Sequence, residues 1–286
     1  MKKTFSLLAI CATLLLASCS KEKSIDSSDP DGPNNGGNTP KGLLVKTVIQ
    51  LGQTDSSVTN FSYDGEGRLS RMWLSGNQNV MSDPGEVRVE RDAQGRIKAI
   101  GIRDEVGATT DSRVYTVHFN TSTNRYISKV VSETYQGVLY KDSIVYNYNA
   151  NGQITEEVYY VSVENSPYAD WSKTEFTYGS NGNLTEYKGY FRDPMSSNYV
   201  QASHIAIEYD NKPSPLVLGA EGILLDQINF VSPNNVTRAT VTDLEEPSNS
   251  EVVSYAYEYN DKNKPATANI TFQSVGLPIP ATFYYQ

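Results

Sequence analysis

A short pattern that recurs along the chain limits its possible folds more than any other feature. The pattern reads aromatic or aliphatic residue, any residue, aromatic residue, a turn of about four residues, then an aliphatic residue. Its copies begin at Phe61, Val89, Val117, Tyr146, Phe176, Ile207 and Tyr257, with those at 117, 207 and 257 degenerate. The steps between copies are 28, 28, 29, 30, 31 and 50 residues, which indicates one repeated structural unit with an insertion in the last step.

Each copy has the sequence of a β-hairpin. Alternating residues lead into an Asp/Asn-x-x-Gly turn and out of it again, and glycine supplies the positive φ that such a turn requires. We therefore expect positive φ at the glycines of the four clearest copies, Gly67, Gly95, Gly152 and Gly182. The stretches Thr123-Asn124-Arg125 and Lys212-Pro213 lack this glycine, so the sequence leaves those two turns undefined.

Seven copies predict an all-β fold of about 14 strands in sequential antiparallel order. A helical turn is suggested only near Glu221 to Gln227. Because strand twist accumulates, a flat sheet of this width is improbable, and we expect a strongly curled meander or a half-barrel. Tyrosine supplies 20 of the 28 aromatic residues and is expected to fill the inner face of this sheet.

The first 42 residues predict export and lipidation. Lys2 and Lys3 precede an apolar run from Phe5 to Leu16, and Leu16-Ala17-Ser18-Cys19 resembles the end of a bacterial lipoprotein signal. The run is shorter than the ~20 residues of a membrane-spanning helix. Residues 1–18 are expected to be removed, Cys11 with them, and the resemblance implies a lipid on Cys19.

The polar stretch after Cys19 predicts a flexible tether over residues 19–42, with a coil reach of about 25 Å, followed by one repeat domain over residues 43–286. Position 20 is Ser rather than Asp, which resembles outer-membrane rather than inner-membrane lipoproteins. The predicted location is therefore the outer membrane of the cell envelope, with the leaflet left open.

Loss of the signal leaves 22 basic residues against 33 acidic residues. This excess of negative charge argues against nucleic acid as a partner, so the predicted membrane contact is the lipid at Cys19.

Signs of catalysis are few. The only histidines, His118 and His204, lie in strand-like stretches, and no Cys or His cluster has metal-ligand spacing. The acids Glu156, Glu157, Glu175, Glu186 and Glu208 could in principle form a glycosidase pair on a concave sheet face. Their alternation with lysines is more typical of solvated cross-strand charges, so we predict no enzyme activity, no cofactor and no metal site.

Aromatic side chains in the outgoing strands give the better functional hypothesis. Neighbouring strand residues point to opposite faces, so some of these rings must face away from the core. The candidate platform for a polysaccharide or an envelope protein is Trp73, Tyr160, Trp171, Tyr187 and Tyr190. The alternatives are a carbohydrate hydrolase and a purely structural module in which tyrosines fill two partly buried faces.

The copies YDGEGRL and RDAQGRI resemble the YD repeats of RHS-type proteins. With Tyr209 to Pro215, Ser232 to Thr237 and Tyr257 to Asn260, they resemble a family of uncharacterised Bacteroidetes lipoproteins with YD-like hairpin repeats. The resemblance covers nearly all of residues 43–286. It implies a fold and an envelope location, and it assigns no catalytic residue.

Overall fold

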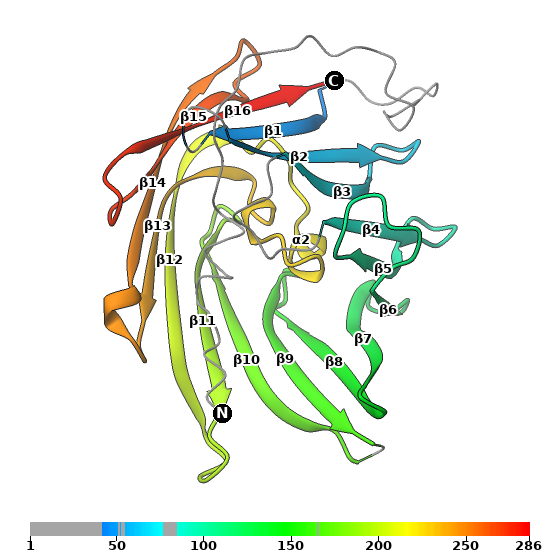
Figure 1. Ribbon diagram of the computed structural model, residues 1–286. Helices are drawn as coiled ribbons and strands as arrows, with labels where there is room; N and C mark the ends of the chain where they lie inside the picture. The colour runs from blue at the N-terminus through cyan, green and yellow to red at the C-terminus, as the bar shows by residue number, and fades with distance from the viewer. Residues whose placement is uncertain (1–41, 51, 53–54, 77–84, 165) are drawn as a thin grey trace.

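A single closed β-barrel of sixteen antiparallel strands is the architecture of the chain, in a computed structural model that describes residues 42–286 apart from 51, 53–54, 77–84 and 165 (Figure 1). Each strand pairs with the next along the sequence, and β1 pairs with β16 to close the ring. The predicted signal over residues 1–18, the lipidated Cys19 and the tether up to residue 41 lie outside the described residues.

The strands of the first half of the barrel are β1 (Leu44–Gln50), β2 (Ser56–Tyr63), β3 (Leu69–Gly76), β4 (Glu86–Arg91), β5 (Ile97–Arg103), β6 (Arg113–Asn120), β7 (Arg125–Tyr135) and β8 (Val138–Tyr148). Those of the second half are β9 (Ile154–Val163), β10 (Ala169–Tyr178), β11 (Leu184–Arg192), β12 (Tyr199–Pro213), β13 (Asn234–Asp243), β14 (Glu251–Tyr259), β15 (Pro265–Phe272) and β16 (Pro278–Tyr285). The short helices are α2 (Ala220–Leu224), η1 (Ile228–Phe230) and η2 (Pro247–Asn249).

The expectation of about 14 strands in an open curled sheet or half-barrel is wrong. The seven copies of the pattern do form the strand pairs from β2–β3 to β14–β15. Two further strands, β1 and β16, flank the copies and pair with each other, for example Lys46 with Tyr284 and Val48 with Thr282. Closure removes both exposed sheet edges, which an open sheet of this width would have to protect in another way.

The tight turns have the predicted glycine geometry. Gly67, Gly95, Gly152 and Gly182 have φ between 79° and 83°, which confirms the expectation. Where the third copy lacks glycine, Asn124 takes a φ of 55° in its place, as Asn can at low cost. The first residue of the turn caps it: an Oδ1 of Asp64 accepts hydrogen bonds from the backbone N–H groups of Glu66 and Arg68. We call the end of the barrel that carries these turns the turn rim.

The sixth copy has no tight turn. The chain between β12 and β13, residues 214–233, instead folds into the barrel and includes α2 and η1 (Figure 1). Its residues Leu216, Ile223, Leu224, Leu225 and Val231 are buried in the same hydrophobic cluster as wall residues from β1 to β13. We call this segment the plug. The plug contains α2, a short helix at the place where the sequence suggested a helical turn. Among the described residues, no helix is long and apolar enough to cross a membrane.

Tyrosines near the turn rim connect neighbouring hairpins. The hydroxyl of Tyr148 donates a hydrogen bond to the carbonyl of Tyr126 (2.9 Å), and Tyr209 and Tyr285 bond in the same way to Leu184 and Pro265 of the preceding hairpin. Arg91 replaces tyrosine at this position in the second copy, and its guanidinium donates to the carbonyl of Leu69. These tyrosines have a structural role: the ring packs against the interior while the hydroxyl satisfies a backbone oxygen.

The two faces of the wall differ sharply in polarity. The cross-strand neighbours Phe176, Tyr187, Ile205 and Val241 face inward and are buried in the cluster that includes the plug. The adjacent residue on each of these four strands therefore faces outward. This outer row contains Glu175, Lys188, His204 and Thr242, and it continues to Glu156 and Asn147. The outer wall is therefore polar along a line that crosses six strands, from β8 to β13, with ionisable side chains on β9–β12.

Candidate binding site at the turn rim

An ion pair holds the plug to the wall. Arg91, the last residue of β4, is only 8% exposed and donates to both carboxylate oxygens of Glu221 in α2, at 2.8 Å each. The hydroxyl of Tyr126 donates to the same carboxylate at 2.9 Å. Burial opposes the charge on Arg91, but the hydrogen bonds and negative charge of Glu221 outweigh it and raise the pKa of Arg91. The guanidinium stays charged, and its contact with Glu221 fixes α2 against β4 and β7.

A second contact lies deeper in the barrel. Lys129 on β7 is 2% exposed, and its Nζ donates to the carbonyl of Leu224 (2.9 Å) and to the carboxylate of Asp226. Glu157 on β9 faces the same interior, because it pairs with the inward-facing Tyr146. Burial and the negative charge of Asp226 raise the pKa of Glu157 to about 7, although Lys129 and a hydrogen bond from Thr174 oppose the shift. A proton on Glu157 therefore relieves repulsion next to the plug.

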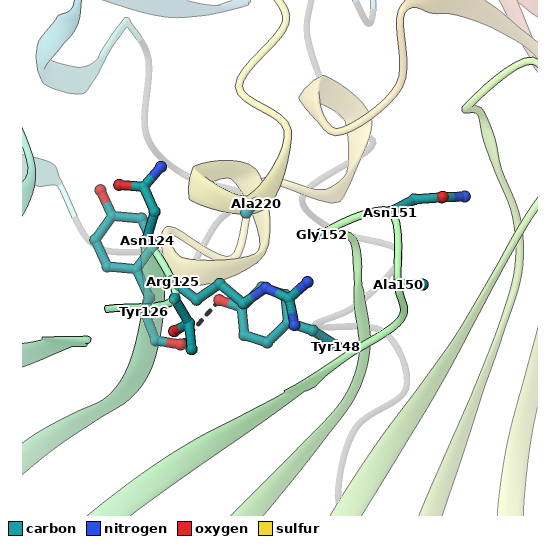
Figure 2. A pocket seen from close by; sticks show the side chains of 9 residues that line it. Asn124, Arg125, Tyr126, Tyr148, Ala150, Asn151, Gly152 and Ala220 are labelled. Atoms are coloured by element: carbon teal, nitrogen blue, oxygen red, sulfur yellow. Dashed lines mark hydrogen bonds between the residues drawn. The ribbon is translucent and has the colours of Figure 1, made fainter. Parts of the chain in front are cut away.

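A pocket of about 360 Å³ opens on the turn rim, and we call it the rim pocket (Figure 2). It lies between the turn after β6, the turn after β8 and the start of α2. The residues that line it are Thr123, Asn124, Arg125, Tyr126, Tyr148, Ala150, Asn151, Gly152 and Ala220. Its volume falls in the range of small-molecule sites, and the mouth of a β-barrel is a frequent position for them.

The lining of the rim pocket combines rings with hydrogen-bonding groups. The Arg125 guanidinium stacks 5.0 Å from the centre of the Tyr148 ring and donates to the carbonyl of Asn149. Tyr148 is in turn fixed by its bond to Tyr126, the contact between these two residues in Figure 2. Asn124 and Asn151 add amide side chains from the two turns. Such a lining can stack the apolar face of a sugar ring and bind its hydroxyl groups.

A second space, the inner cavity, lies between the plug and the wall of β1, β2 and β13–β16. It has a volume of about 140 Å³. The lining includes Ile49, Phe61, Ala268, Ile270, Ala281 and Phe283 from the wall, and Gln227, Asn229 and Phe230 from the plug.

The predicted platform aromatics are only partly brought together. Tyr160 and Tyr190 face outward on β9 and β11, and Trp171 is 55% exposed at a bulge in β10 between them. Trp73 lies on β3 beneath Arg71. Tyr187 is 7% exposed and packs inside the barrel against Phe176, so it cannot serve as an exposed platform.

In a regular strand, Tyr187 would face outward, because it lies three residues after the inward-facing Leu184. A register shift between Thr177 and Tyr178, opposite Leu184 and Glu186, does skip one residue and reverses the faces. Such a bulge follows most of the tight turns, and it decides which aromatic residues line the interior.

The acids considered for a hydrolase do not converge on a concave face. Glu156 and Glu175 lie on the outer wall with Lys173, Glu186 contacts Lys188 and His204, and Glu208 contacts Arg238. Of the five, Glu157 faces the interior. His118 is exposed on the outer wall. Among the described residues, no group of three or more His, Cys, Asp or Glu side chains is arranged to hold a metal ion.

The geometry defines a class: a sixteen-stranded barrel that is occupied at one end by its own chain. Two solved structures share this fold. A porin-like protein from Bacteroides vulgatus is 13% identical with a TM-score of 0.51, over 85% of this chain and 98% of that one. A porin-like protein from Bacteroides uniformis is 10% identical with a TM-score of 0.54, over 87% and 98%. No protein-family model matches the chain, and no curated protein matches it.

Several site residues were missed from the sequence. Arg91 gave a signal, since an arginine stands where most copies have tyrosine, and the 50-residue step marked the insertion that became the plug. Nothing in the sequence singled out Lys129 and Asp226, because a lysine in a strand and an aspartate in a loop usually lie on the surface. Arg125 and the two asparagines become a pocket only when two turns, 27 residues apart in sequence, lie side by side at the rim.

Proposed function

We propose that the protein is a non-catalytic envelope lipoprotein whose plugged barrel stands in water and binds a polysaccharide at the rim pocket. The observation that carries this proposal is the rim pocket itself. It lies at the barrel mouth, rests on a plug held by Arg91 and Glu221, and presents Tyr148, Arg125 and two asparagine amides together.

The outer wall supports a barrel that is surrounded by water rather than lipid. A membrane-spanning barrel presents an apolar band about 25 Å tall to lipid, and a Lys or Arg at its midplane costs about 2–4 kcal/mol. Here the outer face of β9–β12 carries Glu156, Glu175, Lys188 and His204 in one row, with Lys173 between two glutamates. We therefore propose that the lipid at Cys19 attaches the barrel to the outer membrane and that the wall does not insert.

The plug and the pocket lining support binding rather than transport or hydrolysis. Wall residues around most of the ring pack against the plug, which occupies the interior where an open pore would carry water. The nine residues that line the rim pocket include no carboxylate, whereas glycoside hydrolysis requires two.

Binding is tested with the full protein purified in detergent, on a glycan array and by affinity capture from envelope extracts. We expect polysaccharide binding that falls about tenfold or more in Arg125→Ala and Asn124→Gly. The second change keeps the positive φ that Asn124 requires. Asn263→Gly is the matched control, because Asn263 has a φ of 56° in another turn of the same rim. Equal losses in control and pocket variants, or capture of a protein without any glycan signal, would overturn the proposal.

The location of the barrel is tested with Cys19→Ser and with planar bilayers. We expect the unlipidated protein to remain in solution without detergent and the lipidated protein to give no channel steps. Aggregation of the first without detergent, or stable conductance by the second, would show instead that the wall inserts into lipid.

A further inference from the structure

We infer that the inner cavity is a binding site for a small phenolic ring, independent of any ligand at the rim pocket. The cavity is bounded by residues of six strands, β1, β2 and β13–β16, and by the plug. Small side chains create it: Ala268 and Ala281 are cross-strand neighbours on β15 and β16, and both are nearly fully buried. Larger residues at these positions would fill the space.

The walls of the cavity match an aromatic ring. Tyr255 and Tyr257 are stacked with ring centres 6.2 Å apart, and Phe283 lies 6.2 Å from Tyr257 at an angle of 47°. Ile49 and Ile270 complete the apolar side. An apolar cavity of about 150 Å³ is known to stay dry and to accept benzene, and this one is of similar size.

Polar groups also line the cavity. Gln227 and Asn229 come from the plug, and Thr47, Thr59 and Asn235 come from β1, β2 and β13. A water molecule needs two to four polar partners, which the apolar side cannot supply. A ring with a single hydroxyl satisfies both sides at once, because its carbon atoms contact the aromatic wall and its hydroxyl bonds the amides.

The experiment is calorimetric titration of the detergent-purified full protein with phenol, toluene and glucose. We expect saturable 1:1 binding of phenol, weaker binding of toluene and none of glucose. Ala281→Leu should lower the affinity for phenol about tenfold or more. The matched control is Ala256→Leu, because Ala256 is exposed on the outer side of the neighbouring β14 and should leave the affinity unchanged.

Two further variants keep the test decisive. Ala268→Val fills the same space with a smaller change, in case Ala281→Leu lowers the melting temperature. Asn229→Leu should weaken phenol binding more than toluene binding, since it removes only a polar contact. Absence of saturable phenol binding, or equal affinity in Ala281→Leu and Ala256→Leu, would overturn the inference.

Discussion

Removal of the carboxylate of Glu221 should release the plug. In Glu221→Ala, Arg91 loses two charge-assisted hydrogen bonds but keeps those to the carbonyl groups of Gly95 (2.9 Å) and Leu69 (3.1 Å). Breaking a buried ion pair by removing one partner costs about 3–5 kcal/mol. Because Glu221 is 24% exposed and Arg91 retains two acceptors, we expect the opening free energy of the plug to fall by about 2–4 kcal/mol.

The assay is thiol labelling of Val231→Cys, a position in the plug that is 5% exposed. The predicted loss of Cys11 with the signal and lipidation of Cys19 would leave this as the only free thiol. The labelling rate follows the population of the open plug, so a fall of about 2–4 kcal/mol raises it by about 30- to 900-fold. Glu66→Ala, at an exposed rim carboxylate outside the plug, should leave the rate unchanged.

The reasoning fails if Glu221→Ala and Glu66→Ala label at the same rate. It also fails if the faster labelling is matched by an equal loss of global stability in circular dichroism, because the plug would then not open separately. Arg91→Met combined with Glu221→Ala should cost no more than the larger single change, since the two act through one contact.

Three smaller effects follow from the wall and the turns. Glu157 binds its proton more tightly in the folded protein than in the unfolded chain. The free energy of unfolding should therefore fall by at most about 3 kcal/mol as pH rises from about 4.5 through 7. Thermal melts of Glu157→Gln should lack this fall. Tyr148→Phe should cost about 1 kcal/mol in chemical denaturation through the lost bond to Tyr126, whereas Tyr135→Phe, at a side chain 66% exposed, should cost almost nothing. Gly152→Ala should lower the free energy of unfolding by about 1–2 kcal/mol through its φ of 82° alone, since no atom lies within 4 Å of the added methyl. Gly65 has no positive φ, so an equal loss in Gly65→Ala would refute backbone strain as the cause.

The sequence predicts what is local in this fold. The four clearest hairpins are each specified within nine residues, by alternating side chains around a turn with a glycine, and β2 to β15 follow from that pattern and its three degenerate copies. β1 and β16 lie outside the seven copies of the pattern, and they pair with each other although they are far apart in sequence. No local signal states that Lys46 pairs with Tyr284, so closure could not be predicted.

The prediction of which face each side chain occupies failed for a similar physical reason. A bulge after the turn shifts the period of two by one residue, and sequence alternation alone cannot locate it. Tyr187 was therefore assigned to the wrong face, while Tyr160 and Tyr190 do face outward. The rim pocket was missed because its two turns contribute a few ordinary polar residues each, and only the curvature of the sheet brings them together.

The pairing of β1 with β16 also determines when the barrel can close during folding. These strands are the first and last of the domain, so no partial chain can form the ring, however many hairpins have already folded. Until residue 285 is available, β1 and the last strand already formed both present unpaired backbone groups. A newly made sheet therefore needs protection from other strands until its last strand is available.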